Sequence, residues 1–206
     1  MDNNAKSFIL GLDVSTKTVG VALFTEDAEL YELTHISPKA KPLPETKTEE
    51  LICKANLVNE FLKKYSGFNI TNVIIEEPLL GSNNIRTVAV LLRFNGMISK
   101  FVYDYFKVVP SYISTYEARK NGFPELMQPN AKGRIVLFGG YPKGIDKKMV
   151  VWERTAAMFP DIQWLYGRKN NLRKENFDMS DAAAAAIGEM RKNGRWIVKD
   201  NLLQKI

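Results

Sequence analysis

The stretch 8–24, FILGLDVSTKTVGVALF, constrains the fold of this chain more than any other. Its two short apolar runs are typical of buried strands, and the STKT segment between them predicts a hairpin turn. Asp13 interrupts this apolar pattern, although a lone charged side chain is rarely found in a buried strand. Taken alone, Asp13 is either a turn-forming residue or a functional carboxylate.

Further patterns extend the hairpin into an α/β fold. Strands are predicted at 8–12, 19–24, 30–36, 70–75 and 107–113, with RIVLF at 134–138 as a further candidate. Helices are predicted at 47–65, 84–106, 114–120, 146–158 and 178–191, whereas 122–144 and 161–176 read mainly as loops. Three meandering strands followed by strand–helix units predict a mixed sheet with helices on its faces. We expect one domain spanning residues 1–206.

The charge of the chain is concentrated in one segment. The net charge is +6, and residues 132–174 hold ten Lys or Arg against three acids. A basic excess gathered in this way is the electrostatic footprint of a polyanion partner, although solvated basic faces are also common. The single Cys53 is expected to be a small buried residue in a reducing compartment, and His35 to be structural. No apolar run is long enough to span a membrane, and no signal peptide is recognisable, so a cytoplasmic location is expected.

Four carboxylates stand out by position. Asp13 and Glu76 follow buried strands, and Asp178 and Asp181 lie three residues apart at the start of the last helix, where they share a face. Singly, each could be a turn former, a solvated strand end or a helix cap. Together they predict a cluster that needs a cation, and ligation by oxygen alone suits Mg²⁺ or Mn²⁺. Two such ions, about 4 Å apart, support phosphoryl transfer.

The segments GLDVSTKTVGVALF, VIIEEPLL and DMSDAAAAAIGEM, in this order, resemble the RuvC-type Holliday junction resolvases of the RNase H-like superfamily. The family pattern G-x-D-x-S-x-x-x-G is present with one extra residue before its last glycine, Gly20. The strand end at Glu76 and the D-x-x-D-A motif that begins at Asp178 complete the match. One departure is the loop after Glu76, which reads Pro78-Leu79-Leu80 where family members often carry an aromatic residue.

The resemblance implies an RNase H-like mixed five-stranded sheet, with three antiparallel strands followed by parallel ones, flanked by helices. It implies a homodimer, paired through the helix at 84–106, that makes paired nicks in four-way DNA junctions. Two Mg²⁺ ions, with Mn²⁺ as the alternative, would be held by Asp13, Glu76, Asp178 and Asp181. Glu76 is preferred to Glu77, which pleating should turn away. A lysine from the segment before the last helix is also expected near the metals; the candidates are Lys143, Lys147 and Lys148.

The basic loop supplies the predicted DNA contacts. Backbone phosphates are expected to meet Arg168, Lys169, Arg173 and Lys174. Three alternatives remain open. A related RNase H-like nuclease for other branched DNA or RNA–DNA hybrids would share the metal chemistry, and a non-catalytic nucleic-acid-binding module would not need it. An actin-like sugar kinase is disfavoured because D-V-S-T lacks the glycine of its phosphate loop and 206 residues leave no room for two large domains.

Overall fold

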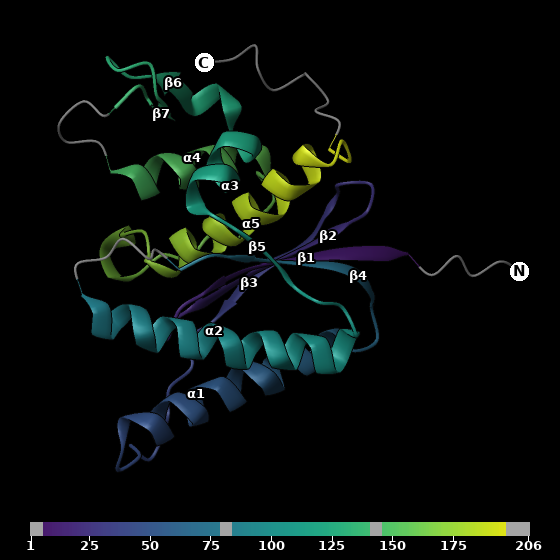
Figure 1. Ribbon diagram of the computed structural model, residues 1–206, viewed down its shortest axis with the longest axis vertical. Helices are drawn as coiled ribbons and strands as arrows, with labels where there is room; N and C mark the ends of the chain where they lie inside the picture. Colours follow the sequence, from purple (N-terminus) through teal and green to yellow (C-terminus); the bar gives the residue numbers. More distant parts are fainter. Residues whose placement is uncertain (1–5, 79–83, 141–145, 197–206) are drawn as a thin grey trace, which may run out of the picture.

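A computed structural model describes residues 6–78, 84–140 and 146–196 of the chain (Figure 1). Its centre is a five-stranded sheet with the strand order β3-β2-β1-β4-β5. The strands are β1 (Ser7–Val14), β2 (Val19–Thr25), β3 (Leu30–Ile36), β4 (Asn69–Glu76) and β5 (Ser111–Ile113). The first three are antiparallel, whereas β4 runs parallel to both β1 and β5. The predicted mixed sheet is confirmed.

Helices cover both faces of this sheet (Figure 1). One face carries α1 (Lys47–Leu62) and α2 (Ile85–Phe106), and the other carries α3 (Thr115–Gly122), α4 (Lys147–Met158) and α5 (Glu175–Lys192). A small hairpin, β6 (Met127–Pro129) and β7 (Ile135–Leu137), and three short 3₁₀ turns, η1 (Lys63–Tyr65), η2 (Pro124–Leu126) and η3 (Arg168–Asn170), complete the described elements. Among the described helices, none is both long enough and apolar enough to cross a membrane.

The pleat of β1 separates two hydrophobic cores and so decides where Asp13 points. Phe8, Leu10 and Leu12 belong to the core between the sheet and helices α1 and α2. Ile9 belongs to the core under α5. Because side chains alternate along a strand, Asp13 lies on the α5 side. By the same alternation Glu76 follows Ile74, a residue of that α5 core, so both strand carboxylates face the same helix.

Helix α5 lies unusually close to the sheet because small residues line the contact. Its alanines, residues 182–186, are fully buried or nearly so. A Cβ atom at Gly20 would collide with the backbone carbonyl of Asp178, and one at Gly11 would collide with that of Ala182. Gly20 pairs with Asp13 across β1 and β2. The absence of a side chain at Gly20 therefore lets the first turn of α5 come down beside Asp13.

Several sequence-based boundaries are wrong for local reasons. Helix α5 begins at Glu175, so Asp178 lies within its first turn rather than at its start. The strand expected over 107–113 is reduced to Ser111–Ile113, because Lys107 adopts a left-handed conformation (φ 57°) that ends α2. The short strand near 134–138 is present as β7, but its partner β6 was not predicted. Cys53 is exposed rather than buried, since α1 buries Leu51, Ala55, Val58 and Leu62 instead.

Candidate active site

One pocket, of about 610 Å³, brings the sequence-predicted carboxylates together. It is lined by Asp13 from β1, Glu76 from the end of β4, and Asp178 and Asp181 from α5. The parallel pairing of β1 with β4 places the ends of these two strands at the same edge of the sheet. The close approach of α5 then supplies the other two carboxylates from above.

The environment of this pocket disfavours negative charge. Burial, reinforced by Glu76 and the two α5 carboxylates, raises the pKa of Asp13 well above its usual value. Burial together with the charge of Asp181 raises the pKa of Glu76 to about 7. Burial also raises the pKa of Asp178. A cation bound among these carboxylates would therefore stabilise their ionised form.

Lys148 is the lysine that the structure places among the carboxylates. Its Nζ lies 3.6 Å from an oxygen of Asp178 and 3.6 Å from one of Asp181. Burial opposes its charge, but the attraction of the four carboxylates, Asp181 foremost, outweighs burial and raises the pKa of Lys148. Lys147 also lines the pocket, whereas Lys143 lies outside the described residues. Of the two candidate lysines that the structure describes, Lys148 is the one with carboxylate contacts at 3.6 Å.

Helix α3 contributes two polar residues that the sequence analysis missed. The Thr115 hydroxyl donates a hydrogen bond of 2.5 Å to Oε1 of Glu76. The Arg119 guanidinium lies 3.5 Å from Asp181, and its buried Nε has no hydrogen-bond partner among the described residues. The capping box that begins at Ser114 predicted this helix correctly. Its approach to the carboxylates depends on the pairing of β4 with β5, which local sequence does not encode.

The donor set of the pocket suits a hard divalent ion, although the side chains are not arranged around one. Four carboxylates and no histidine form the all-oxygen set that Mg²⁺ prefers. Among the described residues, no group of three or more acidic, histidine or cysteine side chains is placed to hold an ion. Lys148 and Arg119 neutralise the carboxylates instead. Glu77 also borders the pocket, and because β4 ends at Glu76, strand alternation does not fix its direction.

The raised pKa of Glu76 predicts a pH-dependent stability in metal-free protein. Because this pKa is about 7 against 4.5 for a free glutamate, the folded protein keeps a proton that the unfolded chain has released. The stabilising contribution is complete below pH 4.5 and is lost as the pH rises through 7. Relative to Glu76→Gln, the parent should lose roughly 3 kcal/mol of unfolding free energy over this window. Urea unfolding in EDTA at several pH values measures this, and parallel pH curves would refute it.

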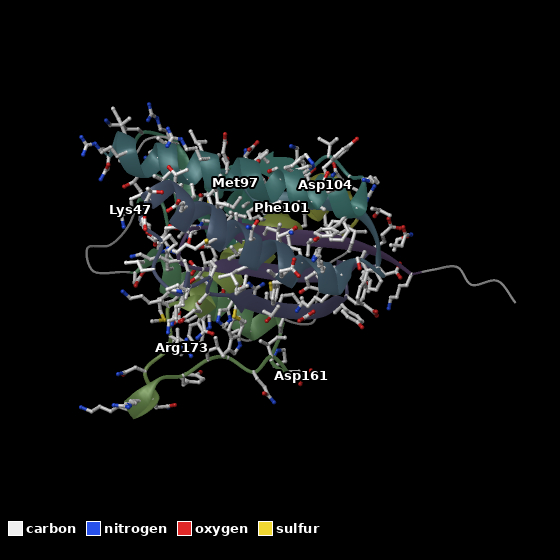
Figure 2. All side chains as sticks on the ribbon, turned by 90° about the horizontal axis from the view of Figure 1, so that it is seen from below. Lys47, Met97, Phe101, Asp104, Asp161 and Arg173 are labelled. Atoms are coloured by element: carbon white, nitrogen blue, oxygen red, sulfur yellow. The ribbon has the colours of Figure 1, made fainter. Side chains whose placement is uncertain are left out.

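The sequence-predicted DNA contacts lie on the other side of the α5 N-terminus. Arg168, Arg173 and Lys174 line a second pocket of about 640 Å³, and Lys169 is exposed next to Arg168 in η3. The segment between Asp161 and Arg173 projects from the body of the protein (Figure 2). These side chains are therefore accessible to a large ligand, although they do not reach the carboxylate pocket.

Comparison with solved structures shows which fold carries this site. Thermus thermophilus RuvC in complex with a Holliday junction substrate matches with a TM-score of 0.59 and 11% identity, over 91% of this chain and 95% of that chain. A second Thermus thermophilus RuvC structure matches with a TM-score of 0.52 and 14% identity, over 91% of this chain and 97% of that one. The chain has a RuvC-type resolvase fold.

The yeast mitochondrial Holliday junction resolvase Ydc2 has the same RuvC-type fold. It matches with a TM-score of 0.58 and 13% identity, over 92% of this chain and 80% of that chain. No family model matches the sequence and no curated protein is significantly similar to it. The RuvC-type fold therefore rests on the three-dimensional arrangement, and it agrees with the resemblance seen in the sequence motifs.

Proposed function

We propose that this protein is a Mg²⁺-dependent endonuclease that hydrolyses phosphodiesters at four-way DNA junctions by a two-metal mechanism. The observation that carries the proposal is the meeting of Asp13, Glu76, Asp178 and Asp181 in one pocket of a RuvC-type fold. The raised pKa values of three of them fit a site that gains from divalent cations. The solved RuvC complex contains a Holliday junction substrate, which supports branched DNA as the ligand of this chain.

In this proposal each side chain has a defined task. The four carboxylates hold the ions, which when bound would activate the attacking water and neutralise the departing oxygen. Thr115 orients Glu76 through its hydrogen bond. Lys148 and Arg119, which pair with Asp178 and Asp181 in this structure, would supply positive charge for the scissile phosphate once ions occupied the carboxylates.

The proposal is tested by cleavage of a labelled four-way junction beside linear duplex and an RNA–DNA hybrid, each with Mg²⁺ and with EDTA. Paired nicks that are confined to the junction and require Mg²⁺ are the expected result. Cutting of the hybrid instead would assign the protein to a different RNase H-like activity. Binding without cleavage of any substrate would favour a non-catalytic module.

Lys148 provides a prediction within the site. Lys148→Ala should lower the single-turnover cleavage rate roughly a hundredfold, because it removes a positive charge positioned at the developing negative charge. Junction affinity should change only a few-fold. Lys147→Ala is the matched control, since Lys147 is adjacent in the sequence and borders the same pocket. Equal rate losses in the two variants would contradict the role given to Lys148.

We also propose that the protein acts as a homodimer through α2. Met97 and Phe101 turn one side of this helix toward the core (Figure 2). Ile85, Leu92 and Tyr103 are exposed by 82%, 47% and 47%, and Gly96 lies between the last two with open space above it. The spacing of these four residues places them on one stripe of the helix. An apolar stripe with a glycine at its middle suits close packing against a second helix.

The dimer proposal predicts that Leu92→Lys converts the protein to a monomer, because it places a charge in the centre of the stripe. Sedimentation equilibrium measures the change. Leu57→Lys on α1 is the control, since Leu57 is exposed by a similar 40%. A parent protein that is monomeric, or a Leu92→Lys variant that remains dimeric, would refute this interface.

A further inference from the structure

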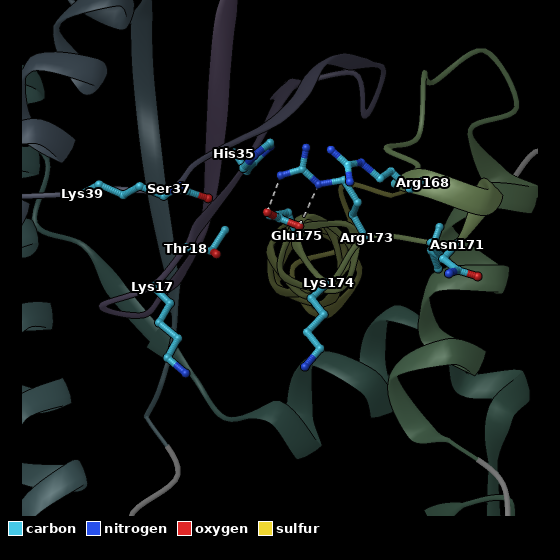
Figure 3. Close-up of a pocket in the computed structure, with 12 residues that line it drawn as sticks. Lys17, Thr18, His35, Ser37, Lys39, Arg168, Asn171, Arg173, Lys174 and Glu175 are labelled. Atoms are coloured by element: carbon cyan, nitrogen blue, oxygen red, sulfur yellow. Dashed lines mark hydrogen bonds and ion pairs between the residues drawn. The ribbon is translucent and has the colours of Figure 1, made fainter.

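A second pocket, here called the basic pocket, lies beside the N-terminus of α5 (Figure 3). It is built from the β1–β2 turn, the end of β3 with the residues that follow, and the loop that leads into α5. Its charged side chains are Lys17, Lys39, Arg168, Arg173, Lys174 and Glu175. The one carboxylate, Glu175, already pairs with Arg173 at 2.5 Å. The pocket therefore has a strong excess of positive charge.

The basic pocket also contains an unsatisfied polar group. Ser37 Oγ is buried and has no hydrogen-bond partner among the described residues. A buried hydroxyl without a hydrogen-bond partner destabilises the folded protein. Figure 3 shows the Ser37 hydroxyl turned toward the side of the pocket on which Arg173 and Glu175 lie. An anion with several acceptor oxygens would satisfy both the excess charge and this hydroxyl.

Thr18 connects the basic pocket to the carboxylate pocket. It lines the basic pocket, and its side chain hydrogen-bonds to Asp178, which lines the carboxylate pocket. Figure 3 shows Lys17, from the β1–β2 turn, and Lys174, at the α5 N-terminus, extending in the same direction. A polyanionic strand that passes through the carboxylate pocket is thus led along the β1–β2 turn into the basic pocket.

We propose that the basic pocket binds a single backbone phosphate of the DNA strand next to the phosphodiester that is cut. Lys17 and Lys174 supply the charge, and the Ser37 hydroxyl donates a hydrogen bond to a phosphate oxygen. This site rests on the proposed function for the identity of the strand. It adds Lys17, Lys39 and Ser37, which lie outside the basic segment at 132–174, to the DNA-contacting surface.

The experiment measures binding of a labelled four-way junction to the Asp13→Asn protein without divalent metal, over a range of salt concentrations. Lys17→Ala should weaken binding about tenfold and reduce the slope of log affinity against log salt by about one. Ser37→Ala should weaken binding about fivefold with no change in slope and no loss of stability to urea. Lys47→Ala on α1, a highly exposed lysine on the opposite face of the sheet, should bind like the parent.

Junctions that carry one neutral methylphosphonate identify the phosphate. At one position near the cut, the substitution should weaken binding by the parent while the Lys17→Ala and Ser37→Ala proteins lose nothing further. The proposed phosphate site would be overturned if both variants bound the junction like the parent. It would also be overturned if every methylphosphonate substitution weakened binding by the variants as much as binding by the parent. If wild-type protein cuts no junction but these binding effects appear, the proposed nuclease function fails and the phosphate site stands. If the wild-type protein cuts junctions normally but the Lys17→Ala and Ser37→Ala proteins bind them like the parent, the proposed nuclease function stands and the phosphate site fails.

Discussion

Replacement of Asp13 by Asn should abolish cleavage while making the metal-free protein more stable. Asp13 is a proposed ligand of the catalytic ions, so its loss should lower the single-turnover rate about 10³-fold or more. Its charge is unfavourable without metal, because burial and the neighbouring carboxylates raise its pKa. Removal of that charge should therefore raise the free energy of unfolding at neutral pH. Junction cleavage in Mg²⁺ and urea unfolding in EDTA measure the two effects.

Measured together, the cleavage rate and the stability of Asp13→Asn distinguish a functional role of Asp13 from a purely structural one. If Asp13 only formed the turn after β1, Asn would preserve the turn and both measurements would stay near the parent values. Asp104→Asn is the control for loss of a charge, because Asp104 lies on α2 and pairs with Lys100 at the surface. Cleavage by Asp13→Asn at the parent rate would show that the site has been misplaced.

Gly20→Ala is expected to have the largest effect of any single methyl group on both stability and activity. The new Cβ would meet the backbone carbonyl of Asp178, and a backbone carbonyl, unlike the end of a side chain, cannot move aside on its own. Helix α5 must shift, at a cost of about 3 kcal/mol of unfolding free energy. The shift also moves Asp178 and Asp181 away from Asp13, so cleavage should fall at least about a hundredfold.

Urea unfolding and junction cleavage test this prediction together. Gly67→Ala is the matched control, since a Cβ at Gly67 meets nothing within 4 Å. The control should stay within roughly 0.5 kcal/mol of the parent. A Gly20→Ala protein with parent stability and parent activity would show that the close contact between α5 and the sheet does not position the site.

The carboxylates were predictable from the sequence because their positions follow from local rules. Asp13 and Glu76 end apolar runs, and Asp178 and Asp181 have the spacing of one helix face. Parallel pairing of β1 with β4, implied by the order of the elements, then brings the two strand ends together. The same local rules predicted the antiparallel meander of the first three strands and the mixed sheet, whereas the side of the sheet on which the site lies came from the structure.

The remaining site residues depend on contacts between segments that are distant in the sequence. Thr115 and Arg119 reach the pocket only because β5 sets the start of α3 beside Glu76. Lys148 is distinguished from Lys147 by the way α4 packs against α5, which composition does not reveal. Ser37 has no charge or motif that would mark it. Cys53 was misplaced because its face of α1 was judged from residue type rather than from the stripe of buried neighbours.

The most direct test of the proposed metal site is a crystal structure of the protein grown with Mn²⁺, with the ions located by their anomalous scattering. Two peaks are expected within the carboxylate pocket, bound by Asp13, Glu76, Asp178 and Asp181, with Lys148 displaced from its present partners. An active protein whose crystals show no ion in this pocket, or ions held only elsewhere, would contradict the account.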